Sequence, residues 1–206
     1  LAILSETLSP DQRSALAGLH EDIAAQWPEW GERIEGSWIP EAWLSRVDPP
    51  MEGRPYINGG AFWIPDPPYG NEWLINLYAL REAGVALIGP DPAVTIPAID
   101  IADVRRASAR DLHDEWVPKL AGDEIFASSH HQAYVTLTIC RILHRAERDE
   151  VASKRATAAW VRERYPEPWI VDLVERAERW RHGVDLDVAD ELGRFIAFAR
   201  DRVAVP

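Results

Sequence analysis

The feature that most constrains the fold of this chain is a change of pattern near residue 97. Before it, short apolar runs alternate with segments of helical periodicity and are separated by breaks rich in Pro and Gly; after it, every periodic segment has helical spacing. A length of 206 residues leaves room for two small cores. We therefore expect an α/β (α+β) domain over residues 1–98 and an all-helical bundle over residues 99–206.

The first part predicts a partial α/β sheet. The pair Ser9-Pro10 predicts the start of a helix, and Gly84 predicts the end of another as a C′ glycine. Strict alternation of apolar and polar residues over 33–39 predicts a strand with Glu35, Ser37 and Ile39 on one face. The expected elements are a strand at 1–4, a crossover helix at 10–26, a strand at 33–39, a loop with a short hairpin or edge strand within 48–70, a helix from 71 to 81 and a strand at 85–90.

The second part predicts a bundle of helices joined by short polar connectors, which is typical of antiparallel packing. Ser153 is the expected cap before Lys154, and Cys140 falls inside an apolar helical pattern and reads as a core residue. The helices are expected at about 100–120, 129–147, 153–165, 167–182 and 187–203.

The charge balance narrows the class of partner. Lys and Arg number 22 against 34 Asp and Glu, a formal net charge of -12, which repels phosphate backbones and argues against nonspecific nucleic-acid binding. A cationic small molecule fits this charge better. With one cysteine and no apolar run near the roughly 20 residues that span a bilayer, we expect a cytoplasmic protein without a membrane segment; its oligomeric state stays open.

Three stretches in order carry a resemblance to a known family. They are Arg33–Pro40 (Arg-Ile-Glu-Gly-Ser-Trp-Ile-Pro), Leu80–Pro90 (Leu-Arg-Glu-Ala-Gly-Val-Ala-Leu-Ile-Gly-Pro) and Ala133–Leu143 (Ala-Tyr-Val-Thr-Leu-Thr-Ile-Cys-Arg-Ile-Leu), the last followed by Val151-Ala152-Ser153-Lys154 and Ala159-Trp160. Together they resemble the bacterial aminoglycoside adenylyltransferases that modify streptomycin and spectinomycin, a branch of the polymerase-β-like nucleotidyltransferases. The resemblance covers essentially the whole chain.

The resemblance implies that residues 1–98 are the C-terminal part of a nucleotidyltransferase domain and that residues 99–206 bind substrate and nucleotide. It also implies ATP as the AMP donor and Mg²⁺ as the metal. In such enzymes a Gly-Ser turn leads into an Asp-x-Asp pair that holds the Mg²⁺ ions, and this signature is absent here. We therefore expect no metal ligand within this chain, and no catalysis by these 206 residues alone.

The resemblance assigns three residues to the reaction. Glu35 occupies the place of the glutamate that acts as base for the drug hydroxyl, and Arg141 and Lys154 occupy the places of a pair that reaches the nucleotide phosphates. A carboxylate within about 2.6–3.2 Å of a hydroxyl is a suitable base, while arginine and lysine suit phosphate. Two structural alternatives stay open: a charged residue at an exposed sheet edge for Glu35 and a salt bridge to a bundle glutamate for Arg141.

A third group of residues is expected to line a site for a polycationic drug. Asp123 and Glu124 would pair with ammonium or guanidinium groups, and Trp63 would stack on a sugar or a cation. His131 stands where streptomycin-modifying relatives carry an aspartate, so the resemblance does not extend to drug specificity.

Two other functions remain as hypotheses. The first is a noncatalytic module that binds a small cation or a protein partner through the helical bundle. The second is a helical RNase, since Arg176 and His182 match a loose Arg-x5-His spacing.

Overall fold

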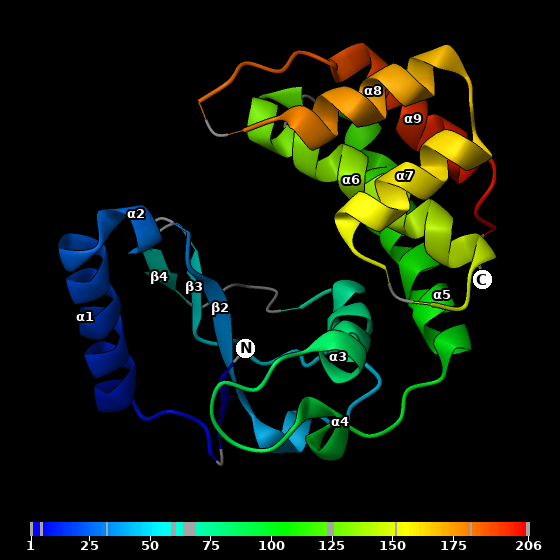
Figure 1. Cartoon of the computed structure of the whole chain (residues 1–206). Helices are drawn as coiled ribbons and strands as arrows, with labels where there is room; N and C mark the ends of the chain where they lie inside the picture. The colour runs from blue at the N-terminus through cyan, green and yellow to red at the C-terminus, as the bar shows by residue number, and fades with distance from the viewer. Residues whose placement is uncertain are drawn as a thin grey trace. The chain divides into compact units, whose positions relative to one another are not determined.

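The computed structural model describes residues 2–4, 6–31, 33–58, 61–63, 69–122, 126–150, 152–181 and 183–204. The chain separates into two compact units, Leu1–Ala98 and Ile99–Pro206. Each unit is described by itself, with the elements labelled in Figure 1.

Among the described residues of the first unit, four short strands form a small sheet. Its strands are β1 (Ala2–Leu4), β2 (Glu35–Pro40), β3 (Tyr56–Asn58) and β4 (Ala61–Trp63), in the order β1-β2-β3-β4. β1 and β2 are parallel and are joined by helix α1 (Pro10–Gln26) and the short helix α2 (Pro28–Gly31), whereas β2, β3 and β4 pair antiparallel. The predicted crossover helix and the predicted hairpin are therefore confirmed.

Strand β2 lies between β1 and β3, and its side chains alternate as the sequence predicted. Ser37 and Ile39 are buried, while Glu35, at the first position of the strand, is exposed. Helix α1 begins at the predicted place, because the Ser9 side chain accepts a hydrogen bond of 3.2 Å from the backbone of Gln12. After β2 the chain makes a short 3-10 turn, η1 (Glu41–Trp43).

The segment 85–90 does not form the strand that its apolar run predicted. It follows helix α3 (Glu72–Ala83) as a series of bends, and the side chains of Leu87 and Ile88 are 93% and 97% exposed. An apolar run becomes a strand only where a neighbouring strand supplies backbone hydrogen-bond partners. This prediction was wrong because no described strand pairs with the run.

Arg81, near the end of α3, holds this region in another way. Its guanidinium donates a hydrogen bond of 2.8 Å to the carbonyl oxygen of Ile96, just after the short helix α4 (Pro92–Thr95). Gly84 ends α3 in an extended conformation (φ -70°, ψ 149°) and not in the left-handed one expected of a C′ glycine. A Cβ at this position would lie 2.2 Å from the carbonyl oxygen of Leu80, so a close approach requires the glycine.

Helices form the described part of the second unit, as predicted. They are α5 (Ile101–Arg110), the π-helical segment η2 (Asp111–Trp116), the 3-10 segment η3 (Pro118–Ala121), α6 (Ser129–Glu147), α7 (Lys154–Arg164), α8 (Pro168–Arg179) and α9 (Ala189–Arg200). Helix α6 packs against α5, α7, α8 and α9 and forms the middle of the bundle (Figure 1).

The helix expected over 100–120 changes type halfway along. After α5, the backbone N–H of Val117 donates to the carbonyl oxygen of Leu112 at 2.9 Å, the i→i−5 bond of a π-helix. Residues five apart then face the same side. As a result, the Nε1 of Trp116 donates to the Oδ2 of Asp111 at 3.0 Å, and both side chains are buried.

The core of the bundle is apolar, and Cys140 belongs to it. Cys140 is fully buried, as predicted, and burial raises the pKa of its thiol. Among the residues that the structure describes, no helix is long and apolar enough to cross a membrane.

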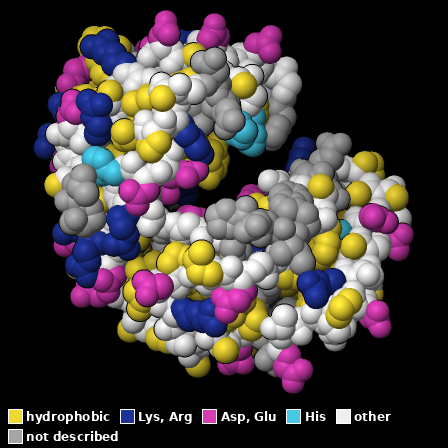
Figure 2. Space-filling model, turned by 180° about the vertical axis from the view of Figure 1, so that it is seen from behind, with side chains coloured by type: hydrophobic (Ala, Val, Ile, Leu, Met, Phe, Trp, Pro, Cys, Tyr) yellow, Lys and Arg dark blue, Asp and Glu magenta, His cyan; other side chains and the backbone are white. Residues whose placement is uncertain are grey.

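On the face drawn in Figure 2, acidic and basic side chains are interspersed.

Candidate functional site

Glu35 lies at the first position of β2 with its carboxylate exposed to solvent. Ser37 pairs with Tyr56 across the β2–β3 ladder, so the Tyr56 ring lies one strand over and two residues along from Glu35. The Tyr56 hydroxyl donates a hydrogen bond to Oε1 of Glu35. A carboxylate that is open to solvent and oriented by a phenol can accept a proton from a bound hydroxyl.

Arg54 places a buried cation against Tyr56. Its Nε donates to Oγ of Ser37 at 3.0 Å, and its guanidinium carbon lies 3.4 Å from the ring centroid of Tyr69 and 5.2 Å from that of Tyr56. Burial lowers the pKa of Arg54 and raises that of Tyr69. A cation packed between two rings fixes the Tyr56 ring, and so the group that contacts Glu35.

Sequence reasoning missed Arg54, Tyr56 and Tyr69. Tyr56 could have been found, because alternation along the predicted edge strand puts it on one face with Asn58, opposite the predicted strand that carries Glu35. Arg54 and Tyr69 lie in a loop region rich in Pro and Gly, where no periodicity indicates which side chain is buried.

Arg141 lies in the middle of α6, as the sequence predicted. Its Nη2 donates to Oγ1 of Thr138 at 3.2 Å, and its Nε is buried without a hydrogen-bond partner among the described residues. Among the described residues, Arg141 forms no salt bridge to a glutamate of the bundle, which was the alternative interpretation. A buried donor without a partner costs about 1–3 kcal/mol, so an anion that accepts from this guanidinium would be stabilised.

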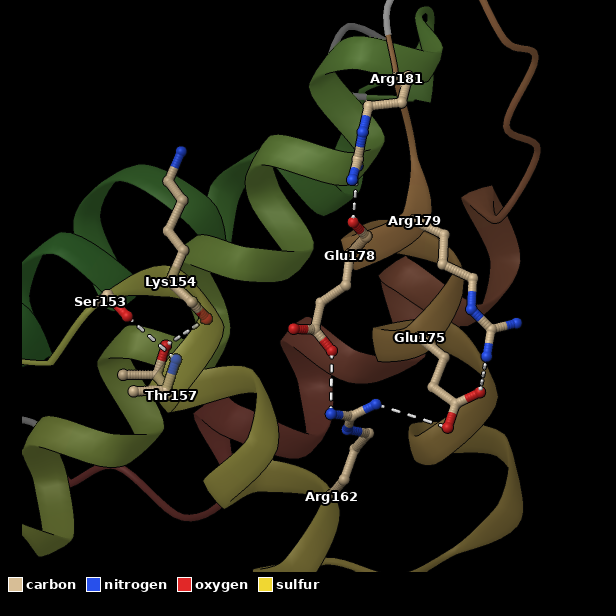
Figure 3. A network of polar contacts seen from close by, with 9 residues as sticks. Ser153, Lys154, Thr157, Arg162, Glu175, Glu178, Arg179 and Arg181 are labelled. Carbon is tan, nitrogen blue, oxygen red and sulfur yellow. Dashed lines mark hydrogen bonds and ion pairs between the residues drawn. The ribbon is translucent and has the colours of Figure 1, made fainter.

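Lys154 is the first residue of α7, and its side chain extends away from the helix in Figure 3. Ser153 caps this helix by accepting from the backbone of Ala156 at 3.2 Å, and Oγ1 of Thr157 donates to the carbonyl oxygen of Lys154 at 3.0 Å. The Nζ atom lies 4.8 Å from the ring centroid of Tyr134 on α6. An ammonium group at the positive end of a helix dipole favours anionic groups such as phosphates.

Arg162 ties α7 to α8 (Figure 3). Its Nη1 lies 3.5 Å from Oε1 of Glu175, and its Nη2 lies 3.1 Å from Oε2 of Glu178. Arg179 also contacts Glu175, at 2.9 Å. The network fixes the helix that begins with Lys154, and it pairs two glutamates of the bundle with Arg162.

An aromatic cluster lies at the N-terminal end of α6. The His130 ring is 5.5 Å from that of Trp180, 6.4 Å from that of Tyr134 and 5.8 Å from that of His131, measured between centroids. His131 is exposed, and its backbone N–H donates to Oγ of Ser128, the N-cap of α6. The structure thus brings His131 to the same helix end as two aromatic rings.

The other predicted substrate residues cannot be placed in this way. Asp123 and Glu124 lie outside the described residues, as does the side chain of Trp63, although the backbone of Trp63 pairs with Tyr56 in the β3–β4 hairpin. Within the described ranges, no group of three or more His, Cys, Asp or Glu side chains could hold a metal ion. Mg²⁺ therefore remains an expectation from the resemblance.

Arg176, one half of the pair proposed for an RNase, is engaged in the bundle. It donates to the carbonyl oxygen of Asp187 and lies within 3.6 Å of Asp172 and 3.8 Å of Glu191. His182 lies outside the described residues. The described contacts therefore give Arg176 a structural role.

Comparisons with known proteins agree with the resemblance seen in the sequence. Residues 95–203 match the family described as aminoglycoside adenylyltransferase, C-terminal domain. This match spans Arg141, Lys154 and His131. A search of curated proteins gave no match.

Among solved structures, the chain is similar to the crystal structure of the spectinomycin adenyltransferase AAD(9) from Enterococcus faecialis with ATP and spectinomycin. The TM-score is 0.67 at 18% identity, over 98% of this chain and 81% of that chain. At this identity the likeness shows a common fold. The family match, in contrast, spans more than half of the 206 residues. The chain belongs to the aminoglycoside adenylyltransferase family.

Proposed function

We propose that the protein containing this chain transfers AMP from ATP to a hydroxyl of an aminoglycoside-like compound. The observation that carries the proposal is the pair of cations on neighbouring helices of the matched domain. Arg141 offers a buried Nε that has no hydrogen-bond partner among the described residues, and Lys154 stands at the N-terminus of α7. The fold shared with an enzyme crystallised with ATP and spectinomycin supports it.

Arg141 and Lys154 would bind the triphosphate in different ways. Arg141 offers a planar guanidinium suited to two phosphate oxygens, and Lys154 offers a point charge reinforced by the α7 dipole. Tyr134, 4.8 Å from the Lys154 ammonium, would limit where that ammonium moves. Phosphates held in this way would present the α-phosphorus in one orientation.

Glu35 would serve as the base. Its carboxylate would take the proton of the acceptor hydroxyl while the hydroxyl oxygen bonds to the α-phosphorus, and the bond from that phosphorus to pyrophosphate would break. The products are the adenylylated acceptor and pyrophosphate. The hydrogen bond from Tyr56 would leave the second carboxylate oxygen of Glu35 available to the hydroxyl.

The acceptor is proposed to be a cationic aminoglycoside-like molecule, with Trp63, Asp123 and Glu124 as further contacts. His131 replaces the aspartate of streptomycin-modifying relatives, and an imidazole supplies no negative charge to a guanidinium group. Spectinomycin, the compound named with AAD(9), is therefore the preferred acceptor for a first test.

Antibiotic susceptibility in bacteria tests this function. Expression of the full-length gene product should raise the spectinomycin concentration that stops growth, and Glu35→Gln should abolish the increase. Glu21→Gln, which changes an exposed carboxylate on α1, is the matched control and should keep it. Equal susceptibility with and without the gene, at confirmed expression and across a panel of aminoglycosides, would contradict the proposal.

A further inference from the structure

Arg145 is a buried cation one turn beyond Arg141 on α6. It is 7% exposed, and its carbonyl oxygen accepts a hydrogen bond of 3.2 Å from Nε of Arg105. Side chains four residues apart on a helix lie on the same face, so the guanidinium groups of Arg141 and Arg145 are neighbours. Two neighbouring positive charges, one of them buried, repel each other unless another group offsets the repulsion.

Asp111 is a buried carboxylate whose negative charge acts on Arg145. It is 8% exposed and begins the π-helical segment η2. The widened turn lets Nε1 of Trp116 donate to Oδ2 of Asp111 at 3.0 Å, which fixes the carboxylate in place. An α-helical continuation of α5 would not bring these two side chains together, so the π segment has a local function.

The three charged groups act on one another. The pKa of Arg145 is lowered to about 10, because burial and, to a smaller extent, the charge of Arg141 lower it while the charge of Asp111 opposes both effects. The Coulomb repulsion between the two guanidinium groups acts equally on both of them. An anion placed at Arg141 would relieve it.

We propose that Arg145 and Asp111 set the phosphate affinity of Arg141, as a buried cation that strengthens anion binding and a buried carboxylate that weakens it. In this proposal both residues act through Arg141 and are therefore positioning residues. This inference rests on the proposed function, since it assigns a regulator to the same phosphate site.

The two charges predict changes of opposite sign, which a purely structural role would not give. Arg145→Met removes a positive charge and should weaken phosphate binding roughly three- to tenfold, the size expected of one charge several Å away near a protein surface. Arg145→Lys keeps the charge and should stay within about twofold of the wild type. Asp111→Asn removes the offsetting charge and should strengthen binding by a similar factor of roughly three to ten.

The experiment is isothermal titration of the full-length protein with ATP and, separately, with inorganic tripolyphosphate. Thermal unfolding of each variant checks that it folds. The double variant Arg145→Met with Asp111→Asn restores neutrality, so it stays informative if a single variant is too unstable. Arg148→Met, an exposed cation at the end of α6, is the control and should leave both affinities unchanged.

The outcomes separate this inference from the function on which it rests. Opposite shifts for Arg145→Met and Asp111→Asn, with rescue by Arg145→Lys, support the inference. If Arg141→Ala weakens binding but Arg145→Met does not, or if Asp111→Asn also weakens it, the inference fails and the phosphate site stands. If Arg141→Ala leaves binding unchanged, or if the wild type binds neither probe, the phosphate site fails and the inference with it.

Discussion

At the scale of single residues, Glu35 is the group on which turnover should depend most. Glu35→Gln keeps the shape and the hydrogen bond with Tyr56 but removes proton acceptance, so kcat should fall by roughly 10²–10⁴-fold while the Kd for ATP stays unchanged. Steady-state kinetics and calorimetry on the full-length protein measure both. Unchanged turnover would remove Glu35 from the mechanism, and a lost ATP affinity would point to a structural role.

Replacement of Arg141 or Lys154 should weaken ATP binding, which replacement of Glu35 should leave unchanged. Arg141→Ala and Lys154→Ala should each weaken ATP binding by about 1.5–3 kcal/mol, the range for hydrogen bonds to charged groups. Arg148→Ala and Arg155→Ala are the controls, since Arg148 is an exposed cation immediately after α6 and Arg155 is an exposed cation on α7. Nucleotide affinity equal to that of the controls in both test variants would show that the phosphates bind elsewhere.

His131 gives a prediction about specificity. His131→Asp restores the carboxylate of streptomycin-modifying relatives, and one charged hydrogen bond to a guanidinium group should improve streptomycin binding by about 1–3 kcal/mol. The change in affinity for spectinomycin should be smaller. Titration with both drugs measures the difference, and a gain that is equal for the two would show that His131 does not discriminate between them.

At the scale of elements, the pH dependence of the bundle should depend on His144 of α6. His144 is 3% exposed and its ring packs edge-on against Trp160. Burial lowers its pKa, the nearby cations Arg148 and Arg145 lower it further, and Glu150 opposes them. The folded state therefore binds a proton at His144 less readily than the unfolded state does. The contribution of the neutral His144 to the free energy of unfolding is complete above the unfolded pKa of about 6.5, and it is lost as the pH falls below that value.

Urea unfolding at a series of pH values tests this prediction. The free energy of unfolding should decline as the pH falls from about 7.5 to 5, the range in which histidine titrates. His144→Gln should flatten the decline, whatever its own effect on stability. An equal slope in wild type and variant would assign the dependence to other groups, among them the buried His20 of the first unit, whose pKa burial also lowers.

Sequence pattern located most helices because their apolar residues recur at helical spacing and their caps are explicit. Ser9 and Ser153 cap α1 and α7 where predicted. The segment 85–90 and the π-helical η2 were missed for different reasons. A strand needs a partner elsewhere in the chain, and a π turn depends on packing such as that between Asp111 and Trp116.

At the scale of the whole molecule, the change of pattern near residue 97 corresponds to the division between the two compact units, Leu1–Ala98 and Ile99–Pro206. The sequence also supplied Glu35, Arg141 and Lys154 as candidates, through motifs that span both parts. It could not supply Arg54 or Arg145, because a lone arginine in a sequence carries no sign of whether its charge will be buried.

The most direct test of the central claim is transfer of AMP from ATP labelled at the α-phosphate. The full-length protein, supplied with Mg²⁺ and either spectinomycin or streptomycin, should attach label to spectinomycin and release pyrophosphate in equal amount. Glu35→Gln should abolish the transfer while ATP still binds. No labelled aminoglycoside, from a protein that binds both ATP and the drug, would contradict the assignment of this chain to adenylyl transfer.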